Sequence, residues 1–273
     1  MAHFSKSRVY FSRTPPLLPY SSIIFLICLG DAIMSYASPV YIQSFVSNPA
    51  IMGLIISVSS FIGFICDIIF AKIFSHKSSH FYLWLTIVIA AIFPASFLLF
   101  PPGLATFIFG MITWGIYFEL LLFSNFNFIN EYIPQTHYSG AWGTISSFKS
   151  TSYLLGPVIS GFLLGLSSKI NFSGPLVAYL IALFGFLIFY KSFSQKKAFE
   201  NVSANDQLSR ASLWQELVIW SKLFHKIWPV YLFLFSLSLV DATFWTLGTL
   251  ISESLRSQHF WGAYFYRHTA YRD

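Results

Sequence analysis

The sequence predicts an all-α membrane protein, and two observations support that prediction. Of its 273 residues, 56% are hydrophobic and only 10% are charged, whereas a soluble domain is usually about a quarter charged. The apolar residues also form long continuous runs, and about 20 apolar residues make a helix that crosses a membrane. Backbone polar groups in lipid must bond within their own segment, which favours helices, and a β-barrel would show alternating residues instead.

Seven stretches are long and apolar enough, or nearly so, to span a membrane. They are 21–45, 51–74, 81–100, 103–129, 139–166, 174–193 and 228–251. The segments between them are typical of turns, such as SNPA and PPG. The first run exceeds the core of a signal peptide and no small-residue cleavage site follows it. We therefore interpret it as an uncleaved first span.

Lysine and arginine are unevenly divided between the loops. The N-terminal segment and the loops after the second and sixth spans hold eleven of them, whereas the loops on the other side hold only Lys169. Basic loops stay in the cytoplasm. The sequence thus predicts an integral protein of the cell membrane with a cytoplasmic N-terminus.

On this interpretation the chain has five segments. They are a cytoplasmic N-terminal segment (1–19), a six-span domain (20–193), a cytoplasmic linker (194–227), a seventh span (228–252) and an atypical tail (253–273). The linker contains SLWQELVIWSKLFHKIW, whose apolar residues recur at helical spacing, and we expect an amphipathic helix on the membrane surface. A partner-binding helix is the alternative. The tail is too short and too basic to span, so we expect a chain truncated or frameshifted near residue 255.

The sequence argues against several function classes. It contains no nucleophile elbow, P-loop, HExxH or paired-cysteine motif, so no enzymatic activity, metal or cofactor is expected. Cys28 and Cys66 both lie in apolar runs, which is typical of packing residues. The basic residues lie between apolar runs and not along one face, so no nucleic-acid partner is expected.

Four ionisable residues within the spans are candidates for substrate or proton coupling: Asp31, Glu119, Lys149 and Asp241. A charge inside a membrane costs about 2.5–3.5 kcal/mol on insertion scales, so such residues usually face a cavity or a partner. Consecutive spans are antiparallel, and we expect Glu119 and Lys149 to meet at similar depth. A proton or a charged substrate would neutralise such a pair. The alternative is a structural pair that only helps assembly.

Five further side chains are candidates for polar contacts with a solute, or equally for bonds between helices. They are Tyr36, Gln43, Trp114, Asn125 and Asn127.

The residues around the first buried acid recur near the end of the chain. Aligning Asp31 with Asp241 also matches Phe25, Leu29 and Ala32 with the same residue types 210 positions later. Both segments follow a basic stretch, and six spans separate them. This pattern resembles the parallel halves of the major facilitator transporters.

A motif in the fifth span supports that resemblance. YLLGPVISGFLLG resembles the glycine-proline signature of the family, with Gly156, Pro157 and Gly161 in place and Ser160 replacing one glycine. Proline frees a backbone bond and glycine permits close helix contact, so we expect a bend at a packed interface.

A second motif follows the second span. GFICDIIFAKIF resembles the family's loop motif at Gly63, Asp67 and Lys72, whereas Phe70 and Ala71 depart from it. The resemblance implies that Asp67 pairs across the two halves and steadies one conformation. The alternative is an acid that anchors a helix end among lipid headgroups.

The link between spans four and five adds a third likeness. In NEYIPQTHYSGAWG, Glu131, Pro134 and Gly143 occupy familiar places. Span four lacks the arginine of many proton-coupled members and holds Glu119 instead, which departs from an ordinary drug–proton antiporter.

The resemblance implies the N-terminal six-helix half of a major facilitator transporter, followed by the first helix of the second half. Such a protein moves a small solute, in some members with protons, across the lipid bilayer by alternating access. We expect a second half-transporter or a second copy as partner. The alternative is a non-transporting fragment or assembly module that needs a second half. Small sugar carriers with seven spans would repeat at half the chain, and seven-span receptors would place the N-terminus outside.

Overall fold

The computed structural model describes residues 16–46, 48–73, 77–164, 168–194, 213–248, 250–251 and 254–255. Throughout this part of the chain the regular elements are helices. They are α2 (Leu17–Phe45), α3 (Pro49–Ile73), α4 (Ser79–Leu99), α5 (Leu104–Tyr132), the 3₁₀-helix η1 (Gln135–His137), α6 (Tyr138–Leu164), α7 (Ser168–Ser194), α9 (Leu213–Thr243) and the π-helix η2 (Phe244–Gly248). Most of the predicted segments at 1–19 and 253–273, and the start of the linker at 194–227, lie outside the described residues.

The fold class predicted from the sequence, an all-α membrane protein, is confirmed. By length and composition, α2, α3, α4, α5, α7 and α9 can cross a membrane. The helix predicted as a span at 139–166 exists as α6 but does not reach that hydropathy. Its first half is rich in hydroxyl side chains and contains Lys149. By this measure six described helices qualify, one fewer than the seven predicted spans.

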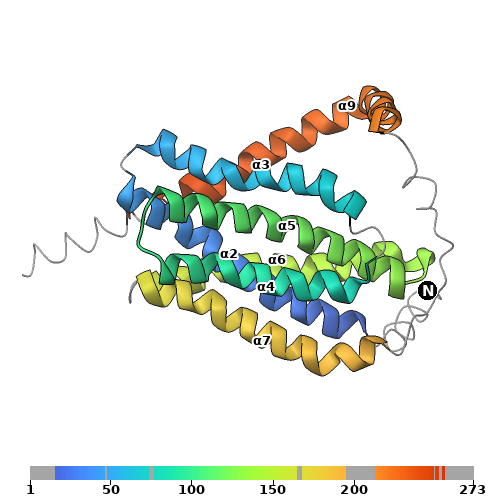
Figure 1. The fold of residues 1–273 in the computed structure, drawn as a ribbon, viewed down its shortest axis with the longest axis horizontal. Coiled ribbons are helices and arrows are strands. Elements are labelled where there is room, and N and C mark those ends of the chain that lie inside the picture. The colour runs from blue at the N-terminus through green and yellow to red at the C-terminus, as the bar shows by residue number, and fades with distance from the viewer. Residues whose placement is uncertain are drawn as a thin grey trace, which may run out of the picture.

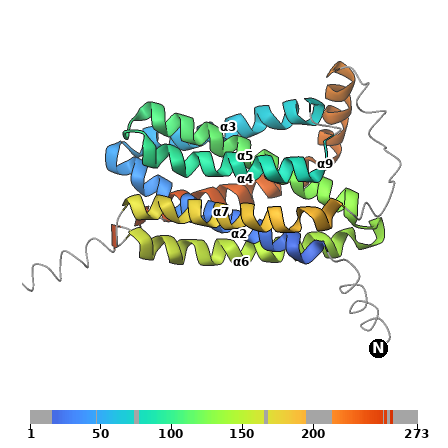
Figure 2. The same cartoon turned by 60° about the horizontal axis from the view of Figure 1, so that its bottom comes forward.

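The helices α2 to α7 form one bundle in which successive helices run in opposite directions (Figures 1 and 2). In its most extensive contacts, α2 packs against α6 and α7, α5 packs against α3 and α4, and α4 packs against α7. Exchanging the first three helices with the last three maps these five contacts onto one another. The bundle is thus built from two three-helix units that pack alike, with α2 equivalent to α5.

The core of the bundle follows α2, whose apolar stretch is the most deeply buried of the membrane-length helices. At one end of this core Tyr20 stacks on Phe128 with ring centroids 3.7 Å apart. Its hydroxyl donates a hydrogen bond to Oδ1 of Asn125 at 2.9 Å. Asn125, predicted as a polar contact residue, therefore joins α5 to α2. Large apolar side chains on the outer surfaces remain exposed, as expected for a protein that faces lipid.

Small residues bring α2 and α6 close together. Ser152, Gly156 and Ser160 recur every four residues on α6 and are all buried. A Cβ at Gly156 would collide with Ala32 of α2. The hydroxyl of Ser152 donates to the Phe25 carbonyl oxygen at 2.9 Å. This spacing lets two membrane helices approach closely, and it confirms the prediction of a packed interface at Gly156.

The other glycine of that predicted packing motif behaves differently. Among the described residues, a Cβ at Gly161 would meet nothing within 4 Å, so the role of Gly161 in packing stays a prediction. Its neighbour Ser160, which replaces a glycine of the signature, holds the interface instead and donates to the Ile33 carbonyl oxygen at 3.2 Å. Pro157 lies inside α6 as predicted.

The equivalent crossing of α3 and α5 is just as close. A Cβ at Gly115 would collide with the carbonyl oxygen of Ser59. A Cβ at Gly63, a residue of the predicted loop motif, would lie 3.1 Å from Oε1 of Glu119. In each of the two close crossings, α2 with α6 and α3 with α5, a helix of one three-helix unit packs against a helix of the other.

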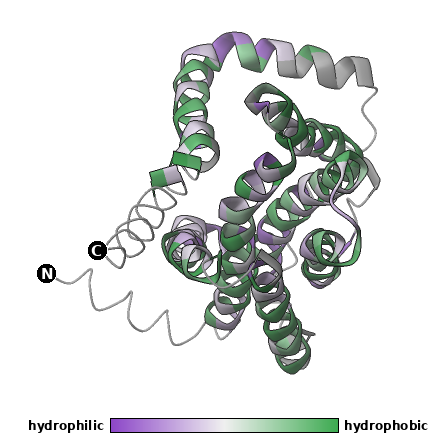
Figure 3. Ribbon diagram, turned by 90° about the vertical axis from the view of Figure 1, so that its left-hand side faces the viewer, coloured by the Kyte–Doolittle hydropathy of each residue, from purple (hydrophilic) through white to green (hydrophobic). Residues whose placement is uncertain are grey.

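The last long helix differs from its prediction. The expected boundary between a surface linker and a seventh span, at 227–228, falls inside α9, which is continuous from Leu213 to Thr243. The helix bends along its length and runs outside the bundle (Figures 2 and 3). Pro229 explains the bend, because it cannot donate to the carbonyl one turn earlier. None of its membrane-length stretch is buried.

Candidate functional site

A single carboxylate lies at the centre of the bundle. Asp31 is in the middle of α2 with 1% of its surface exposed. The indole Nε1 of Trp114 on α5 donates a hydrogen bond to its Oδ1 at 2.7 Å. The hydroxyl of Tyr153 on α6 donates to its Oδ2. Both oxygens are therefore hydrogen-bonded, and three helices meet at one side chain.

Both of these donors are neutral, and Asp31 forms no ion pair with any described residue. A buried charge held only by neutral donors remains costly unless a cation lies nearby or a proton is taken up. Lys149 on α6 is the cation whose charge acts on Asp31, and it also acts on Cys28. The carboxyl group is therefore placed to gain or lose a proton, or to respond to a charge that approaches Lys149.

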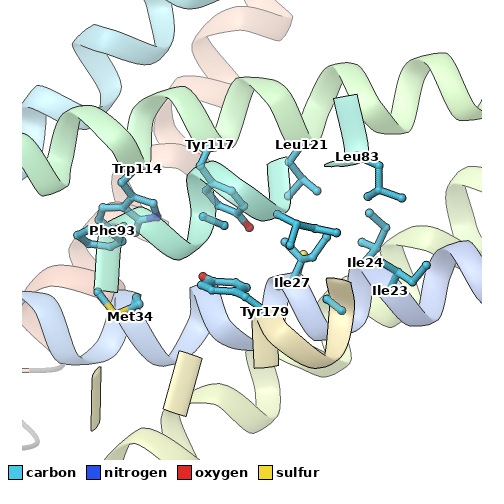
Figure 4. Packing of buried hydrophobic residues seen from close by; sticks show 14 of the residues in the cluster. Ile23, Ile24, Ile27, Met34, Leu83, Phe93, Trp114, Tyr117, Leu121 and Tyr179 are labelled. Carbon is cyan, nitrogen blue, oxygen red and sulfur yellow. The ribbon is translucent and has the colours of Figure 1, made fainter. Parts of the chain in front are cut away.

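Aromatic side chains surround the carboxylate. Trp114 stacks on Phe93 with centroids 5.2 Å apart, and the hydroxyls of Tyr117 and Tyr179 point toward the same region between their helices (Figure 4). The Tyr117 hydroxyl is buried and has no nitrogen or oxygen partner among the described residues. A Cβ at Gly30 would lie 2.6 Å from the Tyr179 ring. Glycine at this position makes room for the tyrosine beside Asp31.

The predicted pair of Glu119 and Lys149 does not form. Oε1 of Glu119 lies against Gly63 on α3, and its carboxylate interacts electrostatically with Asp67. Lys149 lies on α6 and acts on Asp31. Glu119 therefore points toward α3, whereas the charge of Lys149 acts on the carboxylate of α2. The expectation of a Glu–Lys pair was therefore wrong.

The line along which α5 meets α6, called the seam below, sets the register of the two helices. Near the α5–α6 link, the rings of Phe126 and Trp142 meet edge to face with centroids 5.0 Å apart. Deeper in the bundle, Trp114 and Tyr153 meet at Asp31. Since the two helices are antiparallel, this register places Lys149 opposite the residues near 118. Glu119 nevertheless lies against Gly63 of α3, so its carboxylate does not meet Lys149.

The other predicted site residues lie away from this centre. Asp67 is exposed on α3, and Lys72 belongs to the same helix, with its side chain outside the described part. Asp241 is exposed on α9 and so lies outside the six-helix bundle. The predicted roles of these three residues stay predictions.

Glu131, singled out in the link between spans four and five, has a definite structural task. Its Oε1 accepts a hydrogen bond from the backbone N–H of Ser79 at 3.0 Å, and its Oε2 accepts one from the Ser79 hydroxyl at 2.7 Å. The carboxylate at the end of α5 therefore caps the start of α4, where unpaired N–H groups and the helix dipole favour a negative charge.

The tyrosines of the site were not predicted from the sequence. Tyr153 follows Lys149 by four residues, so both lie on one face of α6. That spacing is the only signal that would have singled it out, since 20% of the chain is aromatic. Trp114 was named among the polar candidates, but its bond to Asp31 was not foreseen.

The site joins three helices through one carboxylate, and the charge of Lys149 acts on that carboxylate from α6. Such a site can take up a proton or respond to a charged solute. No protein-family model, no curated protein and no solved structure matches this chain.

Proposed function

We propose that this chain is one half of a secondary transporter of the major facilitator type, which moves a small solute by alternating access. The main support is the packing of its six-helix bundle. Exchange of α2, α3 and α4 with α5, α6 and α7 maps the five most extensive helix contacts onto one another. Nested three-helix repeats of opposite orientation are typical of each half of such transporters.

The position of the buried acid supports the same proposal. Asp31 belongs to one three-helix unit, whereas its donors Trp114 and Tyr153 belong to the other. Transporters of this class bind solutes and coupling ions near the bilayer midplane, where repeats meet. A carboxylate at that junction suits proton coupling, and the solute would bind near it. The cytoplasmic N-terminus predicted from the loop charges belongs to this proposal.

A second candidate function is an assembly module that transports only together with another half. It is favoured by α9, because no residue in its membrane-length stretch is buried. A lone exposed helix after a complete bundle needs a partner. Under this alternative the partner is a separate second half or a second copy of the chain.

The experiment that tests transport asks whether one position on α6 opens to both sides of the membrane. Cys28 and Cys66 are replaced by alanine, and Ser150, exposed on α6, is replaced by cysteine. The chain is reconstituted in oriented vesicles and treated with a membrane-impermeant thiol reagent from each side in turn. Alternating access predicts labelling of Ser150→Cys from both sides.

The matched control is Gln135→Cys, exposed in the short link between α5 and α6. It is expected to label from one side only, which proves that the vesicles are oriented and sealed. Labelling of Ser150→Cys from one side only would contradict alternating access in this chain and favour the assembly module.

A further inference from the structure

The charge of Lys149 is not neutralised by any ion pair within the described part of the chain. The residue lies in the middle of α6, and its side chain is partly buried beside Tyr153. It acts electrostatically on Asp31, yet no acidic oxygen of a described residue lies within ion-pair distance of it. An unpaired ammonium inside a membrane bundle is costly, so an anionic ligand at this position would lower that cost.

The face of α6 around Lys149 is polar. Ser146, Lys149, Ser150 and Tyr153 are spaced three and four residues apart and so share one face of the helix. Ser146 and Ser150 are exposed, so their hydroxyls are free to donate to an anion held by the ammonium. This strip supplies one positive charge and several hydrogen-bond donors.

The opposite side of the seam is apolar. Phe118 and Leu122 of α5 are 36% and 41% exposed, and Phe126, four residues further along, is exposed as well. The contact of Phe126 with Trp142 closes the seam at one end, and the ring of Trp114 lies 5.5 Å from that of Phe118 at the other. An organic group fits against this wall better than a hydrated inorganic ion.

We propose that the transported solute is a small organic monocarboxylate, with its carboxylate on Lys149 and its apolar body against Phe118 and Leu122. This inference rests on the proposed transport function and names its substrate class. A single ammonium neutralises a single negative charge, whereas a dianion keeps one charge unneutralised and is repelled more strongly by the carboxylate of Asp31. Binding of the solute charge at Lys149 would also weaken the attraction that Lys149 exerts on Asp31 and so favour proton uptake there. The site thereby links solute and proton.

Equilibrium binding to the purified full chain in lipid nanodiscs tests this proposal. The probes are propionate and benzoate, each paired with its neutral isostere, propionamide and benzamide, and choline serves as the cation. At least one carboxylate is expected to bind at least about tenfold more tightly than its amide, because the hydrogen bonds to Lys149 are charge-assisted. Equal affinity of acid and amide, tighter binding of choline, or no binding at millimolar concentrations would overturn the proposal.

Variants locate the site. Lys149→Gln is expected to lose at least about tenfold in carboxylate affinity, whereas Lys149→Arg keeps the charge and most of the affinity. Lys222→Gln, on the exposed α9, is the control and should bind as the wild type does. Undiminished binding by a folded Lys149→Gln protein would also overturn the proposal. The comparison of acid with amide on the wild-type chain needs no variant to fold.

The two proposals fail in different ways. Carboxylate binding at Lys149 together with one-sided labelling of Ser150→Cys would leave the binding site in place and remove transport. Two-sided labelling without carboxylate binding would leave transport in place and remove this substrate class.

Discussion

The indole nitrogen of Trp114 donates a 2.7 Å hydrogen bond to the carboxylate of Asp31, and this bond joins the two three-helix units at the centre of the bundle. Asp31 is nearly inaccessible to solvent, so no water replaces a donor that is lost. This hydrogen bond therefore contributes more to the free energy of unfolding than an exposed hydrogen bond does. It also gives the most direct test of how the two units hold together.

Replacing Trp114 with phenylalanine removes the donor but keeps an aromatic ring in the core. Oδ1 of Asp31 loses its donor, and we expect the free energy of unfolding to fall by about 2–4 kcal/mol from the lost bond and the smaller ring. Equilibrium unfolding in detergent micelles measures it. Trp142→Phe is the matched control, since Trp142 packs on Phe126 and donates no hydrogen bond among the described residues. Equal losses in both variants would show that only ring size matters.

Gly156→Ala tests the crossing of α2 and α6. Its new methyl group would collide with Ala32, and the helices would have to separate at a cost of about 1–3 kcal/mol. Gly161→Ala makes the same chemical change five residues later, where nothing lies within 4 Å. It should leave stability unchanged or raise it by up to about 1 kcal/mol, because alanine favours helix. Thermal unfolding of the two variants side by side decides between these outcomes, and a stable Gly156→Ala protein would contradict the close crossing.

Glu131→Ala removes the carboxylate that caps α4. Two hydrogen bonds to Ser79 disappear, and we expect a loss of about 1–2 kcal/mol, as for other helix caps. Hydrogen exchange should become faster at the first backbone amides of α4 and remain unchanged in α2. Gln135→Ala, at an exposed position of the neighbouring link, should alter neither. Unchanged exchange at Ser79 in the Glu131 variant would show that the cap does not stabilise this helix end.

Pro229→Ala tests the cause of the bend in α9. Alanine restores the backbone N–H, so the hydrogen bond to the carbonyl one turn earlier forms and the helix straightens. Spin labels at Lys222→Cys and Ser236→Cys, in a background without Cys28 and Cys66, should then lie farther apart. Pro39→Ala in α2 leaves α9 unchanged and is the control. An unchanged distance in the Pro229 variant would assign the bend to some other part of the chain.

The sequence was sufficient to predict the class of fold and the order of the helices in the bundle. Long apolar runs and the turns between them determine those features directly. The helices that carry the ionisable residues were also predictable, since Glu119 lies on α5 and Lys149 on α6. The direction of Glu119 was not, because α5 is apolar on several faces and a residue one position away points about 100° elsewhere.

The aromatic partners of Asp31 could not be predicted from the sequence, for a different reason. Phenylalanine, tyrosine and tryptophan make up 20% of the chain, so no single tyrosine stands out. The boundary expected at 227–228 rested on the change from a polar to an apolar stretch, but α9 continues through it. A single mid-helix proline can instead be absorbed as a kink.

The close crossings set limits on how the bundle can rearrange. Ser152, Gly156 and Ser160 bring α6 against α2 so tightly that neither can slide along the other without a steric clash. The same holds for α3 and α5 at Gly115. Each tightly packed helix pair would move as one rigid unit. The hydrogen bond from Trp114 to Asp31 joins the pair of α2 and α6 to the pair of α3 and α5. Protonation of Asp31 would therefore weaken the contact between the two helix pairs and leave the packing within each pair unchanged.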